Sequence, residues 1–416
     1  MQSLIILGRQ PELGLAELES LYGATKVRPI ANVAAIVDVD PCLLAFSRLG
    51  GAVKFGKVLT TLETNSLDAI SNFLVKAAPE HSQAMPPGKM HLGISAYGYN
   101  LAPKHVQQLG LKLKRAIRVT GRSVRVDANK EAALSSAQVI HGQLSGSNGW
   151  ELLLIKDGAS SVIGQTIAVQ DIDAYSRRDR NRPARDAKVG MLPPKLAQII
   201  INLSAGPLPP EVTASNCDVA PGVEPPKIHF KDQLLLDPFC GSGVILQEAA
   251  IMGYDCMGSD ISPRMIEYSQ TNLEWLRSWA KSPLQPEVQT TMMQGDATSF
   301  KWPTQPTLIA TETNLGRPFS SIPTSKQLDS VKLECDQIVR SFLHNLGKQI
   351  KSGTRLCLAI PAWQTTGGHL VHLPLLDSIE VIGYNRVSFH HSRDEQLIYS
   401  RPGQIVAREL LVLSKV

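Results

Sequence analysis

A glycine turn flanked by two aspartates is the part of the chain whose residue types and spacing most clearly predict chemistry. The segment 237–243 reads DPFCGSG, follows the apolar run 234–236 and precedes a helix-like stretch at 244–252. A second short strand is expected at 255–259, followed by Asp260. Glycines let a backbone approach a ligand closely, and an acid at this strand tip accepts hydrogen bonds from ribose hydroxyls. The pattern predicts a nucleoside-binding site.

The glycine spacing narrows the type of nucleoside. The G-x-G pattern is followed by residues 244–246, VIL, so the third glycine of a dinucleotide fingerprint is missing. The pattern therefore favours S-adenosylmethionine, which has no pyrophosphate, over NAD. Asp296 follows another expected strand and is predicted to contact the adenine amine, with an ordinary turn aspartate as the alternative.

The elements that position this site belong to a chain of 416 residues, long enough for two or three domains. A content of 43% hydrophobic and 19% charged residues is typical of a folded globular protein. No apolar run reaches the ~18 residues of a membrane helix, and we see no signal-peptide pattern. The six cysteines are scattered without a C-x-x-C pair, which predicts no metal site and favours a reducing cytoplasm.

Basic residues gather in the first half of the chain. Residues 1–200 hold 24 Lys and Arg against 16 Asp and Glu, whereas residues 201–416 hold 18 against 21. The segment 111–125, LKLKRAIRVTGRSVR, has six basic residues and no acid. On a helix over 103–119, Leu111 and Ile117 are expected to face a core while the basic side chains point outward. This face predicts nucleic-acid binding, with an ordinary solvated face as the alternative.

A second basic segment, 175–188, precedes a helix that is expected to begin at Pro193 and Pro194. Pro183 and Gly190 are expected to keep this segment from forming regular helix. The stretch 205–229 is rich in proline and is predicted to be a linker or exposed insertion. Beyond it, strands and helices alternate, which predicts a parallel sheet covered on both faces.

Several segments together resemble a known family. The runs RPARD (182–186), GMLPPKLA (190–197) and DPFCGSG (237–243) are similar to those of the THUMP-domain tRNA guanosine N2-methyltransferases of archaea and eukaryotes. The opening (LGRQP at 7–11, LAELE at 15–19) and the run RPGQIVAREL (401–410) also resemble that family. The resemblance spans most of the chain, is weak over 20–170 and leaves 205–229 unmatched.

The resemblance implies an α/β fold with several modules. It implies a ferredoxin-like piece at 1–60, a THUMP-like RNA-binding domain at 61–170, a linker with a helix and insertion at 171–229, and a Rossmann-like class I methyltransferase domain at 230–416. It also implies that Pro194 and Lys195 lie beside the cofactor pocket. The predicted cofactor-binding residues are Asp237, Pro238, Phe239, Gly241, Gly243, Asp260, Ile261, Asp296, Ala297, Pro194 and Lys195. The predicted RNA-binding residues are Lys112, Lys114, Arg115, Arg118, Arg122, Arg125, Arg182 and Arg185.

The segment that should perform the chemistry departs from the family. Family members follow the fourth strand with Asp or Asn, two prolines and an aromatic residue, but this chain has Glu312, Thr313, Asn314 and Leu315. Guanine's exocyclic amine is a weak nucleophile, so an acceptor for its hydrogens and an aromatic ring for the flipped base are expected to assist. Glu312 can still accept a hydrogen bond, whereas Leu315 offers no aromatic face. These four residues are the predicted catalytic residues.

These patterns predict a cytoplasmic, S-adenosylmethionine-dependent RNA methyltransferase whose favoured acceptor is a tRNA guanosine amine. Two alternatives stay open: a catalytically inactive tRNA-binding protein with the same fold, and a methyltransferase for a DNA base or a protein glutamine. The basic first half disfavours a protein acceptor, and the THUMP-like module disfavours DNA. The predicted partner is tRNA, without a membrane; a small activating protein or a homodimer is left undecided.

Overall fold

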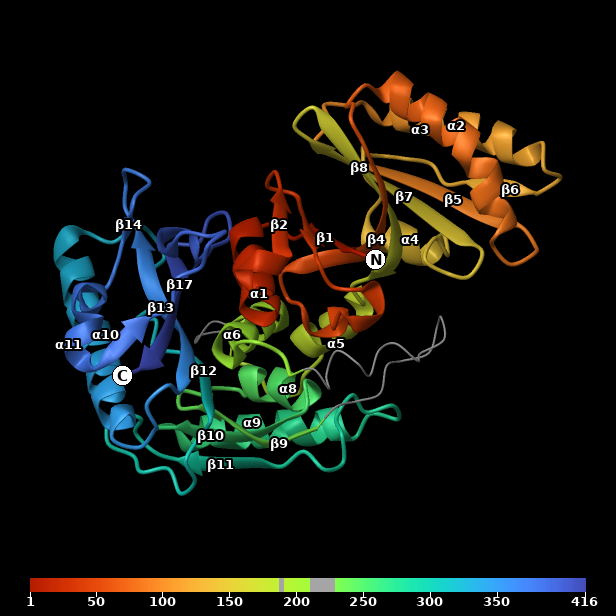
Figure 1. Ribbon diagram of the computed structural model, residues 1–416. Helices are drawn as coiled ribbons and strands as arrows, with labels where there is room; N and C mark the ends of the chain where they lie inside the picture. The colour runs from red at the N-terminus through yellow and green to blue at the C-terminus, as the bar shows by residue number, and fades with distance from the viewer. Residues whose placement is uncertain (187–190, 210–228) are drawn as a thin grey trace.

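The computed structural model of the protein describes residues 1–186, 191–209 and 229–416, which form two sheets joined by helices (Figure 1). The first sheet has eight strands in the order β2-β3-β1-β4-β8-β7-β5-β6. Its strands are β1 (Ser3–Leu7), β2 (Val27–Ile30), β3 (Ala34–Val37), β4 (Ala52–Leu62), β5 (Met90–Tyr97), β6 (Val124–Val126), β7 (Gly149–Asp157) and β8 (Ser160–Val169).

The strand β4 joins the two regions that were expected to be separate modules. It pairs with β1 on one side and with β8 on the other, so one sheet runs through both regions. The boundary expected at residue 60 therefore falls inside β4 rather than in a linker. The end expected at residue 170 lies one residue past β8.

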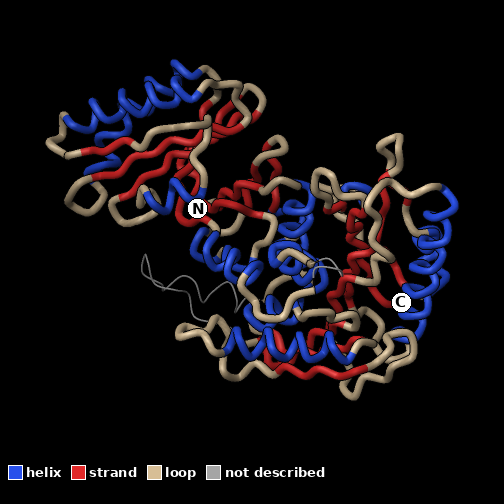
Figure 2. Tube along the Cα trace, turned by 180° about the vertical axis from the view of Figure 1, so that it is seen from behind, coloured by secondary structure: helices blue, strands red, loops and turns tan. Residues whose placement is uncertain are grey.

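Helices cover this first sheet unequally. They are α1 (Pro11–Tyr22), α2 (Leu67–Gln83), α3 (Pro103–Arg118) and α4 (Ser136–His141). Figure 2 shows α2 and α3 side by side on one face of the sheet. In α3 the buried residues are Val106, Leu109, Gly110, Leu113 and Ile117, which follow the helical period. Leu111 lies off this stripe and is 42% exposed, so the expectation that it faces the core was wrong.

Two helices connect the sheets. The first, α5 (Ile172–Arg180), begins where the Asp171 side chain accepts a hydrogen bond from the Ala174 N–H at 2.9 Å. It covers the first part of the basic segment, which was expected to be irregular, because Pro183 acts only after the helix has ended. The second, α6 (Pro194–Ala205), begins with a proline as expected, since the first turn of a helix needs no backbone donor there.

The second sheet has nine strands and is built around β9. Its order is β11-β10-β9-β12-β13-β17-β15, with β14 beside β13 and β16 beside β17. Pairing from β11 to β13 is parallel, whereas β17 is antiparallel to both β13 and β15. The strands are β9 (Phe230–Asp237), β10 (Tyr254–Asp260), β11 (Thr290–Gln294), β12 (Leu308–Glu312), β13 (Arg355–Gln364), β14 (Leu370–Val371), β15 (Tyr384–Arg386), β16 (Ile398–Tyr399) and β17 (Val406–Lys415).

Helices pack on both faces of this sheet. The helices are α8 (Val244–Ile251), α9 (Pro263–Arg277), α10 (Ser325–Gly347) and α11 (Ile379–Ile382). The apolar core on one face contains residues of α6, α8 and α9, and the core on the other contains residues of α10 and α11. Short 3-10 helices occur at Ala24–Lys26, Pro41–Leu43, Phe46–Arg48, Pro374–Ser378 and Asp394–Gln396. The fold is the predicted α/β arrangement.

A buried polar cluster joins the N-terminal region to the second sheet. The Asn202 amide on α6 donates to the Glu17 carboxylate at 2.7 Å and accepts from Arg48 Nε at 2.9 Å. Arg48 also donates to the Tyr254 hydroxyl at 2.8 Å. In Figure 1 the N-terminal elements, α1 and the β1–β3 end of the first sheet, lie between the rest of that sheet and the second sheet. The helix α6 and its buried partners therefore fix the N-terminal region against the second sheet.

Candidate cofactor and acceptor site

The glycine turn lies at the carboxyl end of β9. The chain continues from β9 into α8 on one face of the sheet, whereas from the neighbouring strand β12 it continues into α10 on the other face. Gly241 and Gly243 have φ of 50° and 80°, in the left-handed region that favours glycine. A Cβ at Gly243 would lie 2.9 Å from Ser269 Oγ, so this glycine lets the turn pack against α9. A Cβ at Gly241 would meet no protein atom within 4 Å. The turn thus has one packed side and one open side.

Asp260 ties the glycine turn to the end of β10. Its carboxylate accepts hydrogen bonds from the Gly241 N–H at 3.0 Å and the Ser262 N–H at 2.9 Å. The Gly295 N–H donates to the Asp260 carbonyl at 3.0 Å, which brings the loop after β11 alongside. The carboxylate is half-buried, so it keeps acceptor capacity toward solvent. Asp260 thus lies at the tip of β10, next to the glycine turn.

Two further predicted residues lie on these neighbouring strand ends. Ile261 is 67% exposed beside Asp260, which leaves an apolar surface at the mouth of the site. Asp296 is exposed, and its Oδ1 accepts hydrogen bonds from the Thr298 N–H at 2.9 Å and hydroxyl at 2.8 Å. Ala297 is buried behind it. Asp296 therefore also has the role of an ordinary turn aspartate.

Asp237 forms the buried floor of the turn. Its side chain is 1% exposed and accepts hydrogen bonds from the Thr311 hydroxyl at 2.6 Å and the Phe239 N–H at 3.3 Å. Burial raises the pKa of Asp237 to about 7, although these two donors act in the opposite direction. Ionised Asp237 in this position would favour a cationic ligand group nearby. Pro238 is buried next to it, and Phe239 packs edge-on against Phe342.

Lys195 does not belong with these residues. Its ammonium group donates to the Gln170 side chain just after β8 and lies over the Tyr175 ring at 5.1 Å. The helix α6 packs against α8, the helix that follows the glycine turn, and Pro194 is buried in it. The Lys195 amine, however, is directed toward the first sheet. Its assignment to the cofactor site was wrong, because Gln170 and Tyr175 hold it elsewhere.

Residues 312–315, which are expected to hold the base that accepts the methyl group, are called the acceptor loop. This loop begins at the carboxyl end of β12, next to β9. Glu312 ends β12, and its Oε1 accepts a hydrogen bond from Arg408 Nε of β17. This ion pair is largely buried, with 7% of the Arg408 side chain and 17% of the Glu312 side chain exposed. Burial raises the pKa of Glu312, and the Arg408 charge acts in the opposite direction. The predicted acceptor carboxylate thus already has one cationic partner.

The other three loop residues have different environments. The Thr313 N–H and hydroxyl both donate to the Ala359 carbonyl, at 3.0 and 3.3 Å, so this buried side chain is held by β13. Asn314 is exposed, and its Oδ1 accepts from the Gly316 N–H at 2.7 Å. Leu315 is half-buried. The Thr313 side chain is therefore buried, whereas Asn314 is exposed and Glu312 is partly accessible.

Three functional partners were missed by reasoning from the sequence. Thr311 bonds Asp237, Arg408 pairs with Glu312, and Asn272 of α9 bonds the Ser242 carbonyl at 2.9 Å and Ala184. Arg408 lies in the family-like run at 401–410, which was the one available signal. No local spacing connects these residues to the turn or to the loop.

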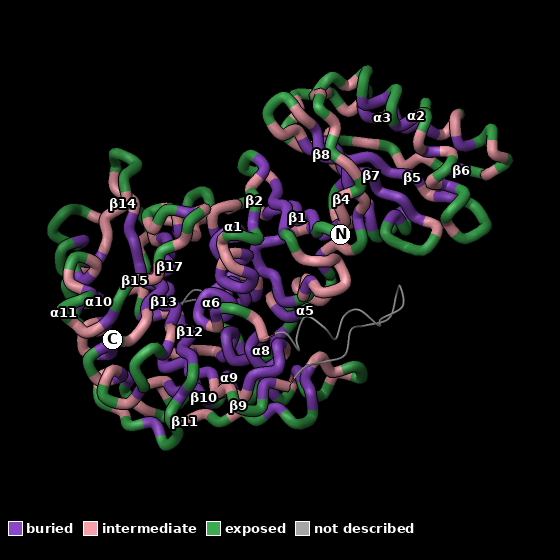
Figure 3. Tube along the Cα trace, viewed as in Figure 1, coloured by how far each residue is buried: buried purple, intermediate pink, exposed green. Residues whose placement is uncertain are grey.

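The predicted RNA-binding residues separate into two groups. Lys112, Arg115 and Arg118 are exposed on α3 and Lys114 is half-buried there (Figure 3). Arg125 and Arg185 are also exposed, with Arg125 3.3 Å from Asp127. These six residues keep their predicted position on the surface.

Arg122 and Arg182 are not free surface cations. The Arg122 guanidinium donates to the Pro86 carbonyl at 2.5 Å and to the Asn148 side chain at 2.9 Å, and also to the Ser82 carbonyl. It therefore joins loops of the first sheet. Arg182 is 2% exposed and lacks a hydrogen-bond partner within the described part of the chain. Their prediction as RNA-binding residues was wrong, because their guanidinium groups are directed into the protein. The predicted cation Lys188 and part of the predicted insertion lie outside the described residues.

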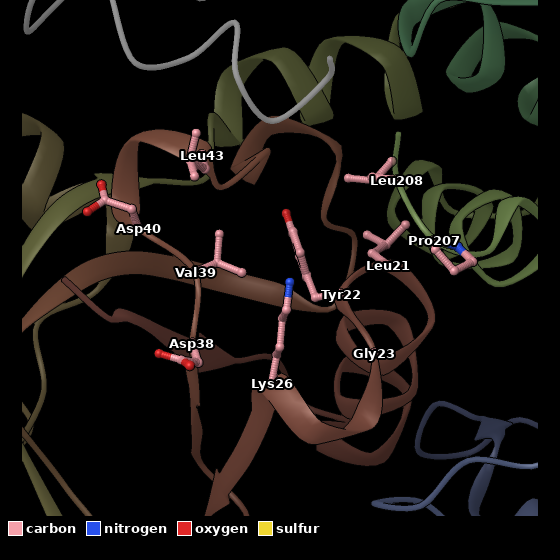
Figure 4. Close-up of a pocket in the computed structure, with 10 residues that line it drawn as sticks. All are labelled: Leu21, Tyr22, Gly23, Lys26, Asp38, Val39, Asp40, Leu43, Pro207 and Leu208. Carbon is pink, nitrogen blue, oxygen red and sulfur yellow. The ribbon is translucent and has the colours of Figure 1, made fainter. Parts of the chain in front are cut away.

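A cavity of about 470 Å³ lies away from this site, against the N-terminal region. Figure 4 shows Tyr22 and Lys26 directed into it, with Asp38 and Asp40 at one side. It is lined by none of the residues predicted from the sequence.

Within the described ranges, no helix has the length and apolarity needed to cross a membrane. The same residues include no group of three or more His, Cys, Asp or Glu arranged to hold a metal.

The strand order and the site together define the class I methyltransferase fold. A parallel sheet carries a glycine turn and an acid on adjacent strand ends, and β17 is inserted antiparallel between β13 and β15. Residues 229–365 match the family described as RMKL-like, methyltransferase domain. The match is confined to residues 229–365, so this part of the chain is similar to that family of methyltransferase domains.

One curated relative matches part of the chain. The tRNA (guanine(10)-N2)-dimethyltransferase of Methanothermobacter thermautotrophicus is 26% identical over 172 residues, 41% of this chain and 39% of that protein. The match thus spans about two fifths of the relative's length. Among solved structures, TrmN from Thermus thermophilus has a TM-score of 0.49 at 16% identity, covering 100% of both chains. SMU.472, a putative methyltransferase complexed with SAH, has a TM-score of 0.48 at 11% identity, covering 98% of this chain and 97% of that one.

Proposed function

We propose that the protein is an S-adenosylmethionine-dependent methyltransferase that acts on the exocyclic amine of a guanosine in tRNA. The observation that carries the proposal is the placement of Glu312 on the strand end next to the glycine turn, with Asp237 between them. A cofactor bound at the turn and an amine held by Glu312 would meet at this edge of the sheet. The curated tRNA methyltransferase supports the choice of RNA as substrate.

The residues of the turn fit the proposed cofactor. The open side of Gly241 leaves room for a ligand against the backbone, and Asp260 offers an acceptor for ribose hydroxyls. The buried Asp237 carboxylate suits an ammonium group, and Ile261 offers an apolar surface for a base. Asp237, Asp260 and Ile261 would hold S-adenosylmethionine, which supplies a methyl group already activated by its sulfonium.

The chain's own residues would then act mainly by positioning. Glu312 keeps Oε2 without a hydrogen-bond partner in the described chain, so this oxygen is available to an amine hydrogen. Accepting that hydrogen returns lone-pair density to the nitrogen and stabilises the positive charge that develops there during attack. After the nitrogen gains the methyl group, its surplus proton passes to this carboxylate.

Binding of tRNA would involve the surface of the first sheet. The cations Lys112, Arg115 and Arg118 share the exposed face of α3 and gain affinity by neutralising phosphates. We assign the region 61–170 as the THUMP-like RNA-binding domain, continuous through β4 with the region 1–60. The protein is proposed to act in the cytoplasm, where the thiols of its six cysteines would stay reduced.

A second function is favoured by one specific observation. The pairing of Arg408 with Glu312, together with the loss of both prolines and the aromatic residue, suits a tRNA-binding protein without catalysis. The two functions differ in whether methyl transfer occurs, since both need a folded pocket and a basic surface.

Nucleoside mass spectrometry of tRNA incubated with purified protein and labelled S-adenosylmethionine tests the proposal. We expect a labelled N2-methylguanosine with the wild-type protein. A matched variant carries the family sequence Asp-Pro-Pro-Tyr at 312–315. Methylation by the variant alone would mean that the natural protein is a binder. Label transferred to DNA or to protein, but not to tRNA, would identify another acceptor. Activity of the isolated chain would also exclude an obligatory activating protein.

A further inference from the structure

Glu312 and Arg408 come from strands that are not neighbours. The strand β13 lies between β12 and β17, so the two backbones are about 10 Å apart. In the strand register Glu312 is opposite Ala359, and Ala359 is opposite Leu410. Arg408 is two residues before Leu410 and therefore has its side chain on the same face. Because Ala359 is small, the two long side chains can meet above it.

The pair leaves the carboxylate in a defined state. Glu312 Oε1 accepts the hydrogen bond from Arg408 Nε, whereas Glu312 Oε2 lacks a hydrogen-bond partner among the residues described. A glutamate has one more rotatable bond than the aspartate that the resemblance led us to expect. A hydrogen bond to a planar guanidinium restricts that bond and sets the direction of the free oxygen.

We propose that Arg408 is a positioning residue for the acceptor reaction: it fixes the longer Glu312 side chain and holds Oε2 toward the amine. The inference rests on the proposed function. Arg408 touches neither the cofactor turn nor the acceptor, and it acts through Glu312. The acceptor end of the site is therefore completed by β17.

The charged groups near Glu312 determine how its pKa changes when Arg408 is replaced. Arg408 of β17 favours the carboxylate, whereas Asp237 of β9 is a like charge nearby. The helix α6 packs over β12 and contributes Lys195, but that amine bonds Gln170. Without Arg408, burial and Asp237 both favour protonated Glu312. Loss of the Arg408 charge would therefore raise the pKa of Glu312. Kinetic measurements are needed as well, because a purely structural ion pair would show the same change in pKa.

Five variants test this proposal: Arg408→Met, Arg408→Lys, Glu312→Gln, the double variant Arg408→Met with Glu312→Gln, and Arg386→Met as a control. Arg386 lies on β15 and pairs with Asp394 at 3.0 Å and with Glu409 of β17 at 3.7 Å, so its loss removes ion pairs from the same sheet, neither of which involves Glu312. Calorimetry with S-adenosylhomocysteine and far-UV circular dichroism establish that each variant is folded and keeps its pocket.

The first measurement needs no cofactor or tRNA. Carbon-13 NMR of protein labelled at the glutamate carboxyls follows the titration of Glu312, assigned by the signal that Glu312→Gln loses. We expect a higher titration midpoint in Arg408→Met than in the wild type, Arg408→Lys and Arg386→Met. An unchanged midpoint in Arg408→Met would overturn the proposal.

The second measurement is the pH dependence of kcat on tRNA with saturating S-adenosylmethionine. We expect Arg408→Met to lower kcat at pH 7 by about 10- to 100-fold, with KM for tRNA within about twofold of wild type. The loss should shrink as pH rises, and Arg408→Lys should recover most of the rate. Added to Glu312→Gln, the Arg408→Met change should lower kcat by less than about twofold more, because the two residues act as a unit.

Wild-type kcat in Arg408→Met, or an equal loss at every pH that lysine does not rescue, would overturn the positioning role. A wild-type protein that methylates no tRNA would overturn the proposed function instead, and the NMR titration would still decide whether Arg408 controls Glu312.

Discussion

The cofactor end and the acceptor end of the site are built over very different distances in the chain. At the cofactor end, the Gly241 N–H bonds an Asp260 carboxylate 19 positions away, within a single strand, turn, helix and strand unit. At the acceptor end, the Glu312 carboxylate pairs with an arginine 96 positions away, across an intervening strand. The first arrangement needs only local folding, whereas the second needs the sheet to close. Changes at Asp260 should therefore act mainly on cofactor binding, whereas changes at Glu312 should act mainly on the acceptor reaction.

The largest effect is expected at the acceptor end. Glu312→Gln keeps the shape of the side chain but removes the charge that we propose stabilises the developing ammonium. We expect kcat for tRNA methylation to fall about 100-fold, as for loss of one preorganised charge-stabilising group, with S-adenosylhomocysteine and tRNA affinity unchanged. Single-turnover transfer of labelled methyl groups measures this, with exposed Glu287→Gln as the control. Full activity of Glu312→Gln would remove Glu312 from the acceptor site.

The next effect is expected at the cofactor end. Asp260→Ala removes the proposed ribose acceptor and also the hydrogen bond from Gly241. A cost of about 1–3 kcal/mol corresponds to a roughly 5- to 150-fold rise in Kd for S-adenosylhomocysteine. Titration calorimetry measures this rise, and Asp296→Ala should cause a smaller one because Asp296 is exposed. Equal affinity in Asp260→Ala and wild type would contradict the pocket.

The third effect concerns tRNA binding by α3 and should leave the cofactor end and the acceptor end of the site unchanged. Replacing Lys112, Arg115 and Arg118 by glutamate removes three proposed phosphate contacts on α3. We expect tRNA binding to weaken about 10-fold or more at moderate salt, and the slope of log affinity against log salt to fall by about 2 or 3. Gel-shift titrations across salt concentrations measure both quantities. A matched change, Arg122→Gln, should lower thermal stability and leave the slope unchanged, because Arg122 bonds backbone carbonyls. A wild-type slope in the triple variant would make α3 a solvated face.

The smallest effect concerns the floor of the cofactor turn. Because burial raises the pKa of Asp237 to about 7, ionising this carboxyl costs stability. The penalty is absent below the ordinary aspartate pKa and is complete above about pH 7. Asp237→Asn should therefore raise the Tm of the cofactor-free protein by roughly 1–3 °C at about pH 8, with little change at about pH 4. Differential scanning calorimetry at both pH values would show it; a gain confined to the acidic sample would contradict the sign.

The features that were predicted from the sequence depend on residues close together in the chain, whereas those that were missed depend on residues far apart. The glycine turn between a strand and a helix at 237–243, the strand ending at Asp260 and the start of α6 were predicted correctly, because glycine spacing and proline position act locally. Leu111 and Lys195 were misplaced, since the facing of α3 and the partners of α6 depend on what packs against them. The same limit applies to Arg122 and Arg182. From the sequence, a basic residue is predicted to be a surface cation, and only the fold shows which carbonyls or helices surround its side chain. The strand β4 likewise runs through the two regions, 1–60 and 61–170, that the resemblance implied as separate modules.

The position of β17 bears on how the protein can be divided into fragments. The matched segment 229–365 ends just past β13, but β13 pairs along residues 355–363 with residues 406–414 of β17. A fragment cut at residue 365 would expose the whole hydrogen-bonding edge of β13, whose residues are apolar and buried. Such an open edge readily pairs with other chains. The fragment would therefore tend to aggregate during expression, and a soluble catalytic piece has to retain β17.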